Sequence, residues 1–180
     1  MKTGLVKKQI VDKRGKRTSV WVKVGDKINS SKPRITKKYF ANLSEKLYSK
    51  IKRRDRGEGA EISLTKAEVS DVLNNGMVGF ISAGVNPNDP NDVKLTPKQV
   101  SQREDKLKAD LIDLGFVFER VKGKYGEEED SFMVLINDIT SKEMEKLGTK
   151  YNQDSVIHSI GNKNKMIFTT GKNKGKRIEG

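Results

Sequence analysis

Residues 116–136, with the sequence FVFERVKGKYGEEEDSFMVLI, contain the two clearest strand signals in this chain. The ends of this stretch, residues 116–121 and 131–136, are rich in Phe, Val, Leu and Ile, which favour strands. Its middle, residues 122–130, holds two glycines and four consecutive acidic residues, a composition typical of a loop. We therefore predict two strands that are joined by an acidic loop.

Three helices are predicted around this pair of strands. Residues 65–76 begin with the capping-box pattern TKAE, in which a Thr side chain and a Glu side chain satisfy the first backbone N–H groups. Residues 96–115 begin with Thr and Pro and carry apolar residues at helical spacing. Residues 140–148 begin with a second capping box, TSKE, and end at a glycine. Each helix therefore has both a start signal and a stop signal.

Further strands are predicted at residues 77–83, 155–159 and 166–170, which are short apolar runs. The order from residue 65 is then helix, strand, helix, strand, strand, helix, strand, strand. This order predicts an α+β fold, with a small and mainly antiparallel sheet and with helices on one face.

The first part of the chain predicts a basic β-hairpin and a helix. Residues 5–11 and 18–24 are strand-like, and residues 12–17 between them supply a turn. A lone hairpin is only marginally stable in water, so Trp21 is expected to act as a packing anchor on the rest of the chain or on a neighbouring subunit. From residue 36, apolar residues at spacings of three and four predict a helix, which the Gly-rich residues 57–59 end.

Charge divides the chain into three parts. Residues 1–56 contain 19 Lys and Arg against four Asp and Glu, whereas residues 57–160 contain 12 against 19. Residues 161–180 contain six against one. We therefore predict a basic N-terminal hairpin and helix at residues 1–56, an acidic α+β domain at residues 57–170 and a basic flexible tail at residues 171–180.

The basic ends are the candidate contacts for a polyanion, because Lys and Arg release counterions from nucleic acid. An acidic protein surface is the other partner that such charge would favour. A solubilising arm with no fixed partner and, for the helix, simple compensation of the helix dipole are the alternatives. The candidate nucleic-acid-binding residues are Lys7, Lys8, Lys13, Arg14, Lys16, Arg17, Lys52, Arg53, Arg54 and Arg56.

Composition excludes several classes of site. The chain has no cysteine, which excludes disulfides and thiolate metal sites, and His158 is its single histidine. No apolar run is long enough for a transmembrane helix, so we expect a soluble protein in the cytoplasm or within a virion, with no membrane partner. The common nucleotide-binding and hydrolase motifs are absent, and we predict no metal and no cofactor.

Three short stretches could carry chemistry. Residues 81–87 (ISAGVNP) could present backbone N–H groups to an anion, or could be an ordinary turn. Residues 127–131 (EEEDS) could bind a hard cation, or could be a solvated hairpin tip. Residues 151–158 (YNQDSVIH) place His158 on a strand face with two apolar residues, which is typical of a partly buried, hydrogen-bonded histidine.

Catalysis, if there is any, would need His158. A metal-independent ribonuclease would use His158 as general acid or base, together with Glu129 and Lys165. The order of the predicted elements is similar to the barnase/colicin/RelE-like ribonuclease architecture. Because fold order alone does not assign function, we treat the chain as uncertain as an enzyme and favour a binding protein.

Several short motifs resemble an uncharacterised domain family of bacteria and their phages, which covers about half of the chain. The matching pieces are ISA at 81–83 with NP at 86–87, LGF at 114–116, Gly126 followed by EDSFMV at 129–134, and YNQDSVI at 151–157. The N-terminal pieces VKK at 6–8, DKRGK at 12–16 and VWVK at 20–23 resemble a leader found on phage proteins, including head-associated ones. The resemblance to this family implies no particular activity.

These observations together favour a phage-type accessory or virion-associated protein. Its basic extensions would contact nucleic acid or a partner surface, and capsid or other phage proteins are candidate partners. The small ribonuclease is one alternative. A factor that takes over the host by inhibiting one of its nucleic-acid enzymes is the other.

Overall fold

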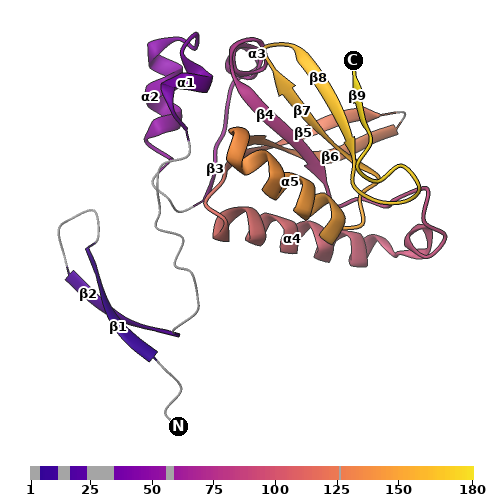
Figure 1. Ribbon diagram of the computed structural model, residues 1–180, viewed down its shortest axis with the longest axis horizontal. Coiled ribbons are helices and arrows are strands. Elements are labelled where there is room, and N and C mark those ends of the chain that lie inside the picture. The colour runs from indigo at the N-terminus through magenta and orange to yellow at the C-terminus, as the bar shows by residue number, and fades with distance from the viewer. Residues whose placement is uncertain (1–4, 12–16, 24–34, 56–58, 126) are drawn as a thin grey trace. The chain divides into compact units, whose positions relative to one another are not determined.

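The computed structural model describes residues 5–11, 17–23, 35–55, 59–125 and 127–180 (Figure 1). The chain divides into two compact units, Met1–Ser30 and Ser31–Gly180. The predicted boundary at residue 57 does not coincide with this division. Residues from Ile35 to Ile51 contribute buried apolar side chains to the larger unit, so the helical segment there belongs to that unit.

The smaller unit contains a β-hairpin. Strand β1 (Leu5–Val11) pairs antiparallel with β2 (Arg17–Lys23), and Lys7 lies opposite Trp21 in the register. The hairpin was predicted at this position. The packing of the Trp21 side chain stays a prediction, and Lys13, Arg14 and Lys16 lie outside the described residues.

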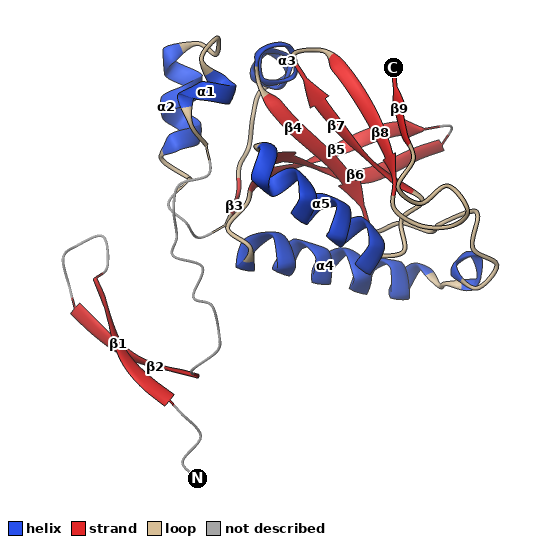
Figure 2. Cartoon of the chain, viewed as in Figure 1, coloured by secondary structure: helices blue, strands red, loops and turns tan. Residues whose placement is uncertain are grey.

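In the larger unit, the described residues form one sheet of seven strands (Figure 2). The strand order is β3-β5-β6-β4-β7-β8-β9, and every neighbouring pair is antiparallel except β3 and β5. The predicted α+β class with a mainly antiparallel sheet is therefore confirmed. The bounds are β3 Ala60–Glu61, β4 Met77–Ser82, β5 Val117–Tyr125, β6 Glu127–Leu135, β7 Ser155–Ile160, β8 Lys163–Phe168 and β9 Arg177–Glu179.

The acidic loop predicted at residues 122–130 is wrong. β5 and β6 continue through this stretch, and their register places Lys122 opposite Asp130 and Lys124 opposite Glu128. Opposite charges that face each other across an antiparallel ladder stabilise the pairing. The four acidic residues are therefore strand residues, and two of them lie opposite a lysine in the register, which the acidic run alone does not reveal.

One face of the sheet packs against helices α4 (Pro97–Asp113) and α5 (Asp138–Lys150), and we call it the closed face (Figure 1). Phe118 and Phe132 meet there edge to face, with ring centroids 5.4 Å apart. Both rings are almost completely buried, together with Leu107 and Leu111 of α4. This face holds the larger hydrophobic core.

The second face carries helices α1 (Lys37–Phe40), α2 (Glu45–Lys52) and α3 (Lys66–Asn75). Helices therefore lie on both faces, whereas one covered face was predicted. Side chains alternate along each strand, so a strand that is apolar at successive positions buries residues on both sides. β6 does so: Phe132 and Val134 join the core of the closed face, and Met133 and Leu135 join the core of the second face.

Of the predicted helices, one starts at its predicted cap Thr36 but is split in two, and another starts two residues earlier than predicted. The helix predicted from residue 36 is split, because the side chain of Ser44 accepts the N–H of Leu47 and begins α2 separately from α1. The helix predicted from residue 140 begins at Asp138, and the N–H of Ser141 donates to the carbonyl of Asn137 within it. The predicted Thr65 and Thr96 caps are confirmed, each with a complete capping box.

The last residues form a strand, whereas a flexible tail was predicted. β9 pairs with β8, and Arg177 forms an ion pair of 2.9 Å with Glu145 of α5. β7 and β8 are joined by a two-residue turn, in which Gly161 (φ 51°) and Asn162 (φ 67°) both have positive φ. Glycine and asparagine tolerate this backbone conformation, which matches the twist of the flanking strands.

Candidate functional site

Part of the second face lies beyond α3 and has no helix over it in the described part of the chain; we call it the open face. Two hollows lie on it. A polar cavity of about 250 Å³ lies where β4 ends and β7 begins, and an apolar groove of about 660 Å³ lies between α3 and β9. Because both hollows are lined by Phe80, Ser131, Ile157 and Met166, they form one continuous depression.

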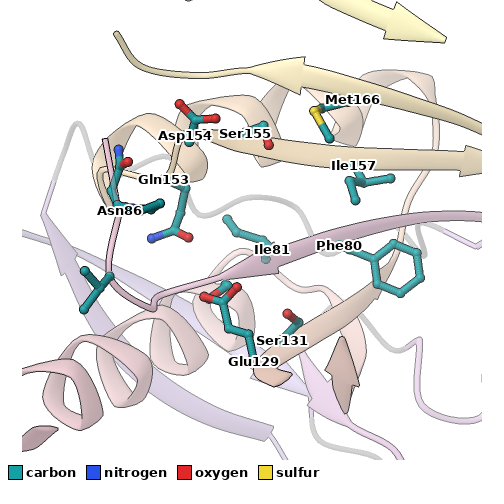
Figure 3. A pocket seen from close by; sticks show the side chains of 13 residues that line it. Phe80, Ile81, Asn86, Glu129, Ser131, Gln153, Asp154, Ser155, Ile157 and Met166 are labelled. Atoms are coloured by element: carbon teal, nitrogen blue, oxygen red, sulfur yellow. The ribbon is translucent and has the colours of Figure 1, made fainter. Parts of the chain in front are cut away.

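The polar cavity is built mainly from three separate stretches of sequence, and Met166 of β8 also lines it (Figure 3). Residues 80–87 supply the end of β4 and the loop that follows it, and β6 supplies Glu129 and Ser131. Residues 153–157 supply the start of β7. All three stretches were singled out from the sequence, but one at a time, and the fold brings them to one place.

Glu129 is held against the end of β4. The hydroxyl of Ser82 donates to one carboxylate oxygen of Glu129, and the N–H of Gly84 donates to the Ser82 hydroxyl at 2.8 Å. A side chain at position 84 would collide with the Glu129 carboxylate. A glycine is therefore needed there for this carboxylate to approach the backbone.

The loop after β4 is fixed by buried polar contacts. The N–H of Asn86 donates to Asp92 at 2.6 Å, and the Asn86 side chain donates to the carbonyl of Asn152 at 2.9 Å. The guanidinium of Arg103 in α4 binds both oxygens of Asp92 at 2.8 and 2.9 Å. Burial raises the pKa of Asp92, but the bonds from Asn86 and Arg103 outweigh it and lower the pKa overall.

Gln153 is locked on the opposite wall. Its side-chain amide donates to the carbonyl of Gly84 at 3.0 Å and to that of Tyr151 at 3.1 Å. The backbone carbonyl of Gln153 accepts hydrogen bonds from the hydroxyls of Thr169 and Thr170. The amide donors of Gln153 and Asn86 are therefore used within the protein and are not available to a ligand.

The remaining polar groups of the cavity are acceptors and hydroxyls. The second carboxylate oxygen of Glu129, the hydroxyls of Ser131 and Ser155, and the carboxylate of Asp154 form no side-chain hydrogen bond with any described residue. All four side chains are only partly buried. No Lys, Arg or His lines the cavity among the described residues. The cavity therefore offers negative charge and hydrogen-bond acceptors to a ligand that donates.

Mainly apolar side chains form the rest of the depression, although Lys122 and Asn164 also line the groove. Phe80, Ile157 and Met166 lie along neighbouring strands, and Val69 and Leu73 of α3 form one side of the groove. Val85 at the polar end is 37% exposed, and Ile178 of β9 at the apolar end is 53% exposed. Two of the large apolar residues that the described structure exposes therefore frame this depression.

The structure does not bring the three ribonuclease candidates together. His158 and Lys165 are cross-strand neighbours, and His158 lies on the closed face beside Gly79, whose α-carbon packs against Met144 of α5. Burial, aided by the charges of Arg177 and Lys165, lowers the pKa of His158 to about 4. Glu129 lies on the opposite face, in the polar cavity. A proton relay between His158 and Glu129 is therefore not formed.

The candidate basic residues of α2 differ in their surroundings. Lys52 donates to the buried Asp55 at 3.2 Å and to the carbonyl of Ile35. Its ammonium group therefore stabilises the fold and is already occupied within the protein. Arg53 and Arg54 are exposed, and neither side chain has a partner among the described residues. Lys7, Lys8 and Arg17 lie on the β1–β2 hairpin, and Arg56 lies outside the described residues.

Comparison with family models, curated proteins and solved structures gave no match to this chain. The resemblance of residues 79–170 to a bacterial and phage domain family therefore stays a prediction. In the described part of the chain, no helix is long and apolar enough to cross a membrane, and no group of three or more acidic or His side chains could hold a metal ion. Function has to be inferred from geometry and charge.

Proposed function

We propose that this chain is a phage-type accessory or virion-associated protein that binds nucleic acid or an acidic partner surface through its basic segments. The observation that carries the proposal is the pair Arg53 and Arg54, which is exposed and has no acidic partner among the described residues. These two residues belong to a segment, residues 1–56, in which Lys and Arg outnumber Asp and Glu by 19 to four.

The charge pattern supports binding by these segments rather than by the body. Residues 57–160 carry 19 acidic against 12 basic residues and would repel a polyanion. Basic residues of the body are also engaged: Lys108 pairs with Glu61, and Lys150 pairs with Asp110 at 2.6 Å. Arg53 and Arg54, by contrast, are exposed without a partner among the described residues and lie in the segment with the largest excess of Lys and Arg.

Binding without catalysis is the simpler function for these residues. The single histidine of the chain is buried and has a lowered pKa, and it lies on the other side of the sheet from Glu129. A general acid or base must reach its substrate within hydrogen-bond distance. The geometry therefore gives no support to the ribonuclease alternative.

The test is a titration of fluorescently labelled duplex DNA with the full-length chain at several salt concentrations. The double variant Arg53→Glu/Arg54→Glu is compared with Lys94→Glu/Lys98→Glu, which makes the same charge change at exposed positions of the acidic body. If both arginines contact phosphates, the first variant lowers the slope of log K against log salt by about two, and the control leaves the slope unchanged.

The outcomes separate the two partner classes. Binding to poly-glutamate with the same loss in Arg53→Glu/Arg54→Glu, but no binding to DNA, would identify an acidic protein surface as the partner. Equal affinity of both double variants for DNA and for poly-glutamate would contradict the proposal. Removal of residues 1–30 then measures how much of the affinity the hairpin unit supplies.

A further inference from the structure

The open face offers a binding site that is separate from the basic segments and has the opposite charge. We propose that it binds an extended segment of a partner protein, with a Lys or Arg side chain in the polar cavity and a neighbouring aliphatic side chain in the apolar groove. The inference does not depend on the proposed function, because it uses different residues and a different class of partner.

The charge of the occupant follows from the hydrogen-bond inventory of the cavity. Its amide donors, on Asn86 and Gln153, are used within the protein, whereas Glu129 and Asp154 keep carboxylate oxygens that no described residue binds. Glu129 rises into the cavity from β6, and Asp154 lies on the rim (Figure 3). In a chain with a net charge of +13, this local negative site selects a cation and repels phosphate.

The size of the cavity favours a side chain over a nucleotide. Pockets that enclose drug-sized ligands measure roughly 300–1,000 Å³. The polar cavity measures about 250 Å³, which suits one guanidinium or ammonium group with its aliphatic stem. A metal ion is not indicated, because the described residues contain no group of three acidic or His side chains.

The apolar groove explains why the cation should belong to a polypeptide. It measures about 660 Å³ and opens directly from the cavity over Phe80, Ile157 and Met166. In an extended chain, alternate side chains point the same way and lie about 7 Å apart. An Arg and a Leu two residues away would therefore reach the cavity and the groove together.

The groups that hold the cavity open are fixed before any ligand arrives. Ser82 and Gly84 position Glu129, and the Asp92–Arg103 pair holds the loop that carries Val85 and Asn86. Sites that need little ordering on binding lose less affinity to entropy. Polar groups that are already held in place are expected in a docking site, and not in an apolar surface that is merely left uncovered.

The experiment titrates the ¹⁵N-labelled full-length chain with the peptide Thr-Leu-Thr-Arg-Thr-Leu-Thr and follows the backbone amides by NMR. The peptide places Arg and both Leu residues on one side of an extended chain, and the Thr residues keep it soluble. Matched peptides replace Arg by Gln or both Leu by Ala. We expect the Arg peptide to shift amides of residues 80–87, 129–131 and 153–157, and each replacement to weaken binding about tenfold.

Two variants of the protein complete the test. Glu129→Gln keeps an acceptor for Ser82 but removes the charge, and should weaken binding of the Arg peptide about tenfold. Ser131→Lys places an ammonium group beside Glu129 and should block the cavity. Asp105→Asn removes an exposed carboxylate of α4, away from the open face, and should leave the affinity unchanged. Thermal melts establish that all three variants are folded.

Three results would overturn the proposal. The first is equal binding of the Arg and Gln peptides, which would mean that the cavity does not select a cation. The second is ethylguanidinium binding as tightly as the Arg peptide, which would make this a site for small cations rather than for a polypeptide. The third is an unchanged affinity in both Glu129→Gln and Ser131→Lys, which would place the peptide elsewhere.

Discussion

The two faces of the sheet use the same strands in different ways. On the closed face, α4 and α5 cover Phe118 and Phe132 completely, and even the polar His158 is buried there. On the open face, Phe80, Ile157 and Met166 remain partly exposed beside Glu129, Ser131 and Ser155, which are partly exposed as well. The difference teaches that the helices bury one face, whereas part of the other stays accessible to solvent.

The largest expected effect comes from the closed face. Phe132→Ala removes a ring that is 1% exposed and packs edge to face on Phe118, and should lower the free energy of unfolding by about 3–5 kcal/mol. The matched control is Phe80→Ala on the open face, for which we expect a loss of less than about 2 kcal/mol, because the ring is already partly solvated. Urea denaturation measures both. Equal losses in the free energy of unfolding would show that the two faces contribute equally to stability, and would contradict the comparison.

The next effect is the pH dependence that His158 confers. The unfolded side chain takes up a proton near its ordinary pKa of 6.5, whereas the folded one does so only at about 4. Acid therefore favours the unfolded state, and the contribution of His158 to stability falls by about 3 kcal/mol as the pH drops from 6.5 to 4.

The variant His158→Leu isolates this contribution. Its free energy of unfolding should fall less steeply than that of the wild type between pH 6.5 and 4, and the two curves should run parallel above pH 7. Denaturant titrations at a series of pH values measure the difference. An identical slope in both proteins would mean that His158 titrates normally and is not buried.

A smaller effect on stability is expected where Asp55 joins the chain before α1 to the end of α2. The buried carboxylate of Asp55 accepts the N–H of Ile35 at 2.7 Å and pairs with Lys52, and so ties the chain before α1 to the end of α2. Asp55→Ala should cost about 2 kcal/mol, because it leaves a buried N–H unpaired. Lys46→Ala, an exposed position on α2, should cost less than about 0.5 kcal/mol.

The smallest effect on stability should come from the open face. Gly84→Ala places a methyl group against the Glu129 carboxylate, which can swing away because it is the end of a flexible side chain. We expect a loss of less than about 1 kcal/mol in a thermal or urea melt. Binding of the Arg peptide should nevertheless weaken, since Glu129 loses its fixed position. A stability loss as large as that of Phe132→Ala would contradict this view of the cavity.

Local signals in the sequence predicted much of the fold. The capping box at Thr65, the cap at Thr96 with its following proline and the strand at 77–83 lie within one segment each, and the structure has the corresponding α3, α4 and β4. The loop predicted at 122–130 failed because residues 127–130 pair with residues 122–125 of β5, and this pairing holds both runs in extended strands. The pairing of residues 122–125 with residues 127–130 cannot be found by examining either segment alone.

The cavity was missed for the same reason. Residues around Ser82, Glu129 and Asp154 lie up to 72 positions apart in the sequence and meet only because β4 pairs with β6 on one side and β7 on the other. Each stretch alone resembles an ordinary turn or a solvated acidic run. The alternation of β6, apolar at successive positions and then polar at Glu129 and Ser131, was the available signal that one face changes from core to cavity.

The most direct test of the open face as a binding surface is a crystal structure of the chain with the Arg peptide. The account predicts the guanidinium within hydrogen-bond distance of the Glu129 carboxylate oxygen that does not accept from Ser82, with a Leu side chain over Ile157 and Met166. A cavity filled by a Lys or Arg of the same chain, with the peptide bound elsewhere or absent, would contradict it.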